Sequence, residues 1–389
     1  MAERLMSILA EATDGESYRA HKYGLDHAER PYIDYGEDSN IWKATAETTH
    51  HRAPVSVDSY LKKFNESGYQ LFSYFLDGSR RVFKVDDIAF RQRRGIYPVI
   101  AGQIGVGCMR RHDRKLACEK FKQEFVLSVP DIADFDGRSG FFPAIVQKLN
   151  KRLEEFPALR NSCVRFSAIL PYDTSKNAEK NFEDKGTAKI QDRMIEQEKK
   201  MVAQLVREEK LNQDNYLIKD GSLEYRPTKE DRKDKRRYQR FQQNYNWVLG
   251  VSKSFNPEVC VDIHGKPNPR FIAKLPLYHR TPVACFTNPD LFGDMKFAVW
   301  YVRIRDSSRT RTLFDGILKI EKMLVTSEEL EYGIDSELVD VLTANIIKER
   351  SPTCYASDMR WANHLYPVYL TESFVKSKYL STESFLQLF

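Results

Sequence analysis

The sequence lacks the features by which several classes of protein are recognised. Its six cysteines form no CxxC pair and are irregularly spaced: Cys108, Cys118, Cys163, Cys260, Cys285 and Cys354. Zinc binding and a disulfide framework are therefore not expected, and a reducing compartment is the simplest assumption. There is no apolar run long enough to span a bilayer, and no apolar segment of a secretory signal follows Met1. We therefore expect a cytoplasmic protein without membrane contact.

Several catalytic motifs are missing as well. The chain has no Walker A loop, no GxGxxG after a strand, no HExxH and no GxSxG elbow. These absences argue against P-loop, dinucleotide-binding, zinc-peptidase and serine-hydrolase chemistry. Charge of neither sign dominates, because 61 Lys and Arg face 55 Asp and Glu for a net charge of +6. This balance permits a nucleic-acid partner without requiring one.

The hydrophobic pattern predicts a packed α/β protein. Aromatic residues make up 12% of the 389 residues, which indicates a sizeable core. We expect strands at 70–76, 97–106, 121–129, 163–170, 216–219, 247–252 and 297–304. We expect helices at 4–12, 56–67, 141–156, 187–211, 229–243, 313–325, 336–349 and 371–388. Strands come early and then alternate with helices, which predicts a mixed sheet flanked by helices.

Residues 1–68 are polar and read as an N-terminal extension that packs on, or projects from, a main domain of residues 69–389. Such an extension could contact a partner or a second copy of the chain.

Two Asp-Gly-Ser motifs follow apolar strands, at Asp77 and at Asp220. An Asp at the carboxyl end of a strand lies at the rim of the sheet, and the following Gly lets the backbone turn away. Two such carboxylates on neighbouring strands would offer hard oxygen ligands to Mg²⁺ or Mn²⁺. Metals held there would stabilise the attacking and the leaving oxygen in phosphodiester cleavage. Asp-Gly and Gly-Ser are also ordinary turn dipeptides, so spacing alone does not decide between a turn and a metal site.

A glutamate on the long helix between the two motifs is the third candidate ligand. Glu198 falls within an apolar stripe, with Met201, Val202 and Leu205 at i+3, i+4 and i+7. A carboxylate on a buried face is costly unless it is paired or binds a metal, although Glu198 could also reach solvent at the edge of the stripe. Glu196 points elsewhere and fits a solvated face.

Lys253 and His364 have both a structural and a functional interpretation. Lys253 ends the strand at 247–252 and could hold a phosphate or balance the acidic residues, or be a surface lysine. His364 could be a general base, a metal ligand or a hydrogen-bonded structural histidine. The basic run at 229–240, with Arg236 and Arg237, is typical of a solvated helix and would suit phosphate contact beside a nuclease site.

Taken in order, these segments resemble the NurA nuclease family. The matching motifs are 76–79, 217–223, 248–253, 300–304 and 364–367, and the resemblance covers the chain from about residue 70 to its end. It implies an RNase H-like fold, Mn²⁺- or Mg²⁺-dependent DNA cleavage, a homodimer, and docking on a HerA-type hexameric ATPase. Three departures stand out: Lys219 precedes the second Asp where an apolar residue is commoner, residues 178–189 are unusually polar, and the first 70 residues have no counterpart.

Carried over by motif, Asp77 and Asp220 become metal ligands, with Glu198 or Glu196 as the helix carboxylate. Tyr301 and His364 become further candidate catalytic residues. The candidate DNA contacts are Lys253, Arg236, Arg237 and Arg303.

The leading hypothesis is a metal-dependent DNA nuclease that works with a ring ATPase in DNA-end processing or anti-phage defence. One alternative is a catalytically silent DNA-binding adaptor of the ATPase. Another is a different RNase H-like enzyme that acts on RNA or on recombination intermediates. Cleavage tests on single-stranded DNA, duplex DNA and RNA with divalent metals separate the three.

Overall fold

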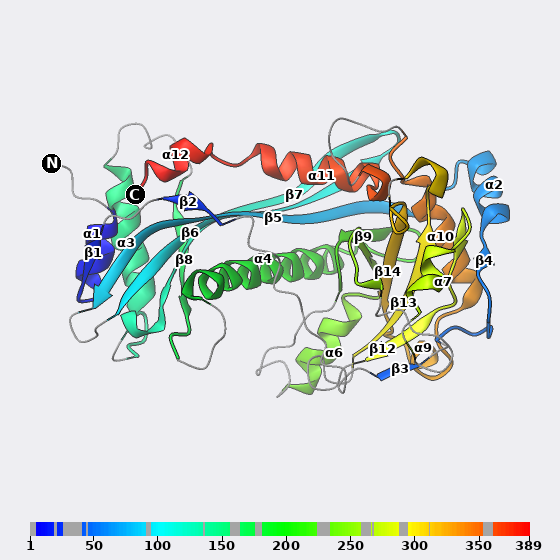
Figure 1. Ribbon diagram of the computed structural model, residues 1–389, viewed down its shortest axis with the longest axis horizontal. Helices are drawn as coiled ribbons and strands as arrows, with labels where there is room; N and C mark the ends of the chain where they lie inside the picture. Colours follow the sequence, from blue (N-terminus) through cyan, green and yellow to red (C-terminus); the bar gives the residue numbers. More distant parts are fainter. Residues whose placement is uncertain are drawn as a thin grey trace.

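A single large sheet organises the chain (Figure 1). The computed structural model describes residues 5–18, 22–25, 41–43, 46–90, 95–134, 137–155, 164–175, 181–223, 234–257, 266, 268–287, 295–310, 312–352 and 361–389. The main path through the sheet runs in the order β3-β12-β13-β14-β10-β9-β5-β6-β7-β8.

The central strands are β5 (Phe72–Phe90), β6 (Ile96–His112), β7 (Lys115–Pro130), β8 (Phe166–Tyr172), β9 (Tyr216–Asp220) and β10 (Val248–Ser252). β5, β6 and β7 form an antiparallel meander. β9 is parallel to β5, and β10 is parallel to β9. The order β7-β6-β5-β9-β10 with these directions is that of an RNase H-like sheet, so the predicted fold class is confirmed.

Further strands extend the sheet beyond β10. They are β14 (Ile317–Met323), β13 (Lys296–Arg303) and β12 (Ala284–Thr287), each antiparallel to its neighbour. The short β11 (His279–Arg280) pairs with β13. The 313–325 segment was predicted as a helix, and that prediction is wrong. Its Leu, Lys, Glu and Met residues favour helix locally, but pairing on both sides with β10 and β13 overrides this propensity.

The strands of the meander are longer than the sequence indicated. β5, β6 and β7 have 19, 17 and 16 residues and extend well beyond β9, toward the end of the molecule where both chain termini lie (Figure 1). The prediction that the first strand ends at Asp77 is therefore wrong. β9 stops pairing with β5 at Leu76, whereas β6 continues to pair with Asp77, Gly78 and Ser79. Pairing on the β9 side of β5 therefore ends just before the first Asp-Gly-Ser motif, whereas pairing on the β6 side continues through it.

Helices cover both faces of the sheet. α4 (Phe182–Arg207) runs along one face of the meander, and α11 (Tyr366–Ser377) runs along the other (Figure 1). Asn181 caps the N-terminus of α4, and its side chain accepts a hydrogen bond from the Asp184 N–H. Its apolar stripe packs on the β5–β6–β7 surface and comprises Ile190, Met194, Met201, Val202 and Leu205.

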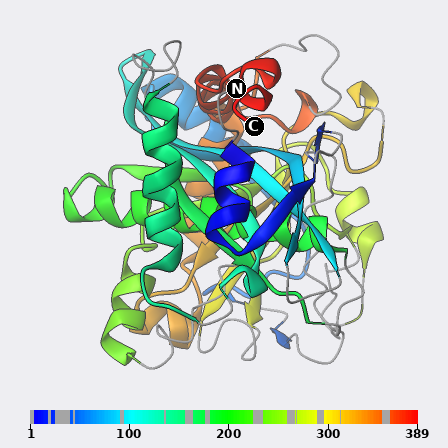
Figure 2. The ribbon, with the colours of Figure 1, turned by 90° about the vertical axis from the view of Figure 1, so that its left-hand side faces the viewer.

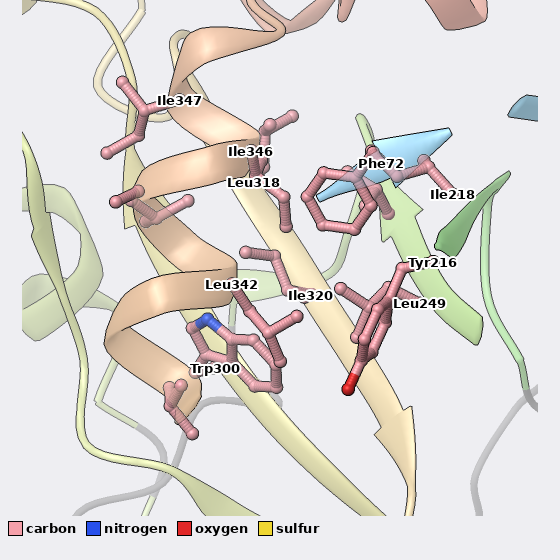
Figure 3. Close-up of a cluster of buried hydrophobic side chains, with 14 of the residues drawn as sticks. Phe72, Tyr216, Ile218, Leu249, Trp300, Leu318, Ile320, Leu342, Ile346 and Ile347 are labelled. Carbon is pink, nitrogen blue, oxygen red and sulfur yellow. The ribbon is translucent and has the colours of Figure 1, made fainter. Parts of the chain in front are cut away.

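α10 (Ser336–Lys348) covers the face opposite to α4 on the β9–β10–β14–β13 side (Figure 3). Leu342 and Ile346 pack with Tyr216 and Trp300, and the Trp300 indole N–H donates to the Thr343 hydroxyl at 2.9 Å. α2 (Asp58–Ser67) packs on α10 from outside. Together these contacts fix the short parallel strands whose ends carry the second Asp-Gly-Ser motif.

Two of the remaining helices lie at one end of the molecule. α1 (Leu5–Ala12) and α3 (Phe141–Glu154) cap the far end of the meander, where they face the viewer in Figure 2. The smaller helices are α6 (Lys235–Gln243), α7 (Pro269–Ala273), α9 (Ser327–Tyr332) and α12 (Thr382–Leu386). The helix predicted at 371–388 is in fact two helices, α11 and α12, separated at residues 378–381. The predicted start of the basic helix at 229–233 lies outside the described residues.

The described parts of residues 1–68 add strands to the sheet. β1 (Gly15–Tyr18) and β2 (Tyr23–Gly24) pair with β5. β3 (Ile41–Lys43) pairs with β12, and β4 (Val55–Ser56) pairs with β11. None of the helices in the described part of the chain has the length and apolar character needed to cross a membrane.

Candidate metal centre

Asp77 and Asp220 come from neighbouring parallel strands. Asp77 lies on β5 directly opposite Gly107 of β6, and Asp220 is the last residue of β9. Gly221 follows Asp220 with a φ of +86°, a left-handed conformation that favours glycine, and turns the chain back over the sheet. The second Asp-Gly-Ser motif is thus a strand-end turn as expected, whereas the first is a mid-strand segment.

A third carboxylate joins the two aspartates from α11. Ligand oxygens of Asp77, Asp220 and Glu372 lie within 4.8 Å of one another. Asp77 is 4% exposed, and the Glu372 side chain is 13% exposed. Glu372 was not predicted from the sequence. A signal was present, since Glu372 falls between the buried Val368 and Val375 at helical spacing.

Lys253 is a largely buried lysine beside these carboxylates. It follows β10, and its Nζ lies 2.9 Å from Asp220 Oδ2 and 3.6 Å from Glu372 Oε2. The Asn363 side chain donates to the Lys253 carbonyl at 2.8 Å, and its own oxygen accepts from the Gly316 N–H. The segment before α11 therefore fixes the backbone at Lys253.

Burial and crowded negative charge control the electrostatics of the site. Burial, followed by repulsion from Asp220, raises the pKa of Asp77 well above its usual value, although Lys253 opposes this. Burial alone would lower the pKa of Lys253, but attraction from Asp220, Glu372 and Asp77 outweighs it and the pKa is raised. Three hard oxygen donors around a small, partly buried space are the donor set that Mg²⁺ and Mn²⁺ prefer. The residues present therefore fit a divalent cation.

Glu198 approaches from the opposite face of the sheet. A Cβ atom on Gly78 would lie 2.3 Å from Glu198 Oε1, so Gly78 makes room for this carboxylate. Adjacent residues of a strand point to opposite faces, which places Glu198 and the Asp77 side chain on different sides of β5. Glu198 is 3% exposed, pairs with Lys219 at 3.3 Å, and is close enough to contribute to the raised pKa of Asp77.

Lys219 and Glu321 hold the turn that follows Asp220. Both residues are register partners of Gly250, one on β9 and the other on β14. Lys219 Nζ donates to the carbonyls of Asp220 and Ser222, at 2.8 and 3.1 Å. Glu321 accepts from the Ser222 hydroxyl at 2.8 Å and from the Leu223 N–H at 2.7 Å.

The turn folds back directly over Gly250, where an added Cβ would lie 2.9 Å from the Gly221 carbonyl oxygen. Lys219, the residue that departs from the NurA pattern, thus helps to orient Asp220.

Glycines in β6 let α11 lie close to the sheet. A Cβ on Gly105 or Gly107 would come within 2.7 or 2.6 Å of the Val375 side chain. At the end of the helix, the Tyr379 ring lies against Gly105 and stacks with the Arg81 guanidinium at 5.2 Å. This close packing brings Glu372 to the aspartates.

Other predicted site residues are not part of the metal-binding group among the described residues. Glu196 is on the solvated face of α4, where it pairs with Arg193 and Lys200. His364 is buried with its ring stacked on Tyr369, and among the described residues the metal-binding group does not include it. Tyr301 is buried on β13 with its ring 5.0 Å from that of Phe255.

The predicted DNA contacts divide into buried and exposed residues. Arg303 is 2% exposed and donates to the carbonyls of Ala273, Leu275, Leu313 and Asp315. Its guanidinium therefore ties loops together at the end of β13, and the prediction that it contacts DNA does not suit this placement. Arg236 and Arg237 are exposed on α6.

The chain was compared with protein families, curated proteins and solved structures. No protein-family model and none of the curated proteins matches the chain. The crystal structure of the NurA nuclease from Sulfolobus solfataricus is similar with a TM-score of 0.41 and 11% sequence identity, over 85% of this chain and 89% of that chain. Similarity of this degree leaves the function to be argued from the residues of the chain itself.

Proposed function

We propose that the chain is a NurA-like, Mn²⁺- or Mg²⁺-dependent deoxyribonuclease. The observation that carries the proposal is the convergence of Asp77, Asp220 and Glu372 within 4.8 Å, on the face of an RNase H-like sheet that α11 covers and where β9 ends. These three carboxylates would hold one divalent cation. The cation would lower the pKa of water and offset the charge that develops on the phosphodiester oxygens.

Glu198 is the candidate ligand for a second cation. It is buried and contributes to the charge around Asp77 from the other face of β5. Its partner Lys219 also holds the Asp220 turn, so a second cation near Glu198 would compete with that lysine. Glu198 thus remains a candidate metal ligand, but Glu372 replaces it as the third ligand beside Asp77 and Asp220.

The remaining residues would bind and orient the nucleic acid. Lys253 is the buried cation beside the carboxylates and would contact the phosphate. Arg236 and Arg237 present charge on an exposed helix and would bind phosphates without reading sequence. The motif order shared with NurA proteins supports a homodimer that docks on a HerA-type hexameric ATPase, in DNA-end processing or anti-phage defence.

The test is cleavage of linear single-stranded DNA, duplex DNA and RNA with Mn²⁺ or Mg²⁺. Asp77→Asn, Asp220→Asn and Glu372→Gln should each lower the rate at least 100-fold while the protein stays folded. Glu196→Gln is the matched control, because that carboxylate lies on the solvated face of α4, and it should keep the full rate.

Full activity in the first three variants would overturn the proposal. DNA binding without cleavage under either metal, alone or with the ATPase, would favour the silent adaptor.

A further inference from the structure

Lys253 supplies a positive charge from the protein itself to the acidic cluster. Lys253 Nζ is 2.9 Å from Asp220 and 3.6 Å from Glu372, and its side chain is 13% exposed. Asp220 and Glu372 thus pair with this largely buried ammonium, and its charge also opposes the raised pKa of Asp77. Lys376 also reaches Glu372, at 2.6 Å, but it does so from the solvent side with its side chain 49% exposed.

The ammonium group and a divalent cation would compete for the same oxygens. A cation bonded to a carboxylate oxygen lies about 2.1 Å from it. If that oxygen were Asp220 Oδ2, the cation would be at most about 5 Å from Lys253 Nζ, with strong repulsion in a site shielded from water. The four-carbon stem of lysine allows the head group to move while the backbone remains fixed. The hydrogen bond from Asn363 to the Lys253 carbonyl supplies that fixed point.

We propose that Lys253 is an exchangeable counter-ion: it neutralises the carboxylates when no metal is bound, and a divalent cation displaces it toward the substrate phosphate. The proposal rests on the proposed metal-dependent function. Displacement delivers a positive charge to the phosphodiester only once the metal is present. The same lysine therefore lowers the metal affinity of the free protein and raises the affinity of the metal-loaded protein for nucleic acid.

The first experiment is calorimetric titration of Mn²⁺ into the full-length protein without DNA. Lys253→Met should bind Mn²⁺ at least tenfold more tightly than the wild type, because it removes the competing charge. Lys376→Met is the matched control, since this lysine contacts the same Glu372 from solvent, and its Mn²⁺ affinity should stay within about threefold of the wild type.

Unchanged or weaker Mn²⁺ binding by folded Lys253→Met would overturn the exchange. If neither Lys253→Met nor the wild type binds Mn²⁺, the proposed metal-dependent function is overturned instead.

A second measurement uses the wild type and does not depend on a variant folding. Amine-specific acetylation followed by mass spectrometry reports how accessible each lysine is. Mn²⁺ should raise the rate at Lys253 at least threefold, because the freed ammonium loses its carboxylate partners, while Lys115, an exposed lysine on the β6–β7 hairpin, provides the reference rate. A rate at Lys253 that stays constant or falls under saturating Mn²⁺ would contradict the displacement.

Discussion

Replacing Asp77 by Asn should stabilise the metal-free protein, although most changes to a buried polar residue destabilise. The ligand oxygens of Asp77, Asp220 and Glu372 lie within 4.8 Å of one another. Two unit charges at that distance repel by about 3 kcal/mol at an effective dielectric constant of 20. Asp220 and Glu372 would each repel Asp77 in this way, and Lys253 offsets roughly one of these two repulsions. Poorer hydrogen bonding of the amide costs about 1 kcal/mol. We expect the free energy of unfolding to rise by ~2 kcal/mol at pH 8.

The gain should depend on pH in a defined direction. Burial and repulsion from Asp220 raise the pKa of Asp77, so the folded protein keeps a proton that the unfolded chain releases above pH 3.9 or so. The contribution of Asp77 to stability is present below that pH and is lost as the pH rises through the folded pKa. Replacement by Asn removes this loss, so the variant should gain more at pH 8 than at pH 5.

Urea unfolding in EDTA at pH 5 and pH 8 measures this difference. Asp86→Asn is the control, because Asp86 is buried on the same strand but accepts hydrogen bonds from the Ser17 hydroxyl at 2.6 Å and the Asp87 N–H at 3.0 Å. It should lose about 1 to 2 kcal/mol at both pH values. If Asp77→Asn loses stability to a similar extent at both pH values, the description of a repulsive acidic cluster is wrong.

Three further changes test other parts of the site. Gly78→Ala should push Glu198 away from Lys219, costing about 1 to 3 kcal/mol in urea unfolding and lowering the cleavage rate; wild-type values for both would contradict the close approach. Glu321→Gln should cost about 3 kcal/mol, since it removes the charge that pairs with Lys319 and weakens the turn after Asp220, and a loss below 1 kcal/mol would argue against the role of Glu321 in holding that turn. Arg236→Ala should weaken DNA binding and reduce its salt dependence in fluorescence titrations without changing stability, and unchanged binding would remove α6 from the DNA surface.

Much of the fold could be predicted because its signals are local. The apolar stripe of α4 and the alternation of apolar strands with helices are set by hydrophobic periodicity. The segment at 313–325 was misassigned because its residues favour helix. Its strand conformation depends on pairing with β10 and β13, and this pairing cannot be read from the segment itself. The length of β5 was missed for a similar reason, since the Asp-Gly-Ser sequence reads as a turn unless the long partner β6 is known.

The site was predicted in part. Asp77 and Asp220 were chosen for their place after apolar strands, and the structure brings their carboxylates together. Glu198 was expected on a buried face and is buried there. Glu372 was missed because the terminal helix was predicted to begin at 371, which left Val368 outside it, whereas α11 begins at Tyr366. The same test that found Glu198, a carboxylate within an apolar stripe, identifies Glu372 between Val368 and Val375.

Arg303 is a residue whose role was predicted from the sequence but does not suit its placement in the structure. The family motif suggested a DNA contact for Arg303, but its four carbonyl partners come from two separate segments, at 273–275 and 313–315. Sequence spacing does not reveal such a cage. Lys219 is similar, because its role depends on the turn folding back over Gly250. Residues that hold a site together are harder to predict than those that form it.

The most direct test of the central claim is anomalous diffraction from crystals soaked in Mn²⁺. The account predicts a peak within about 2.5 Å of oxygens from Asp77, Asp220 and Glu372, with Lys253 Nζ displaced from its present position beside Asp220. The same soak of Glu372→Gln should give a much weaker peak. A Mn²⁺ peak that none of these three carboxylates coordinates, or no peak at saturating Mn²⁺, would contradict the account.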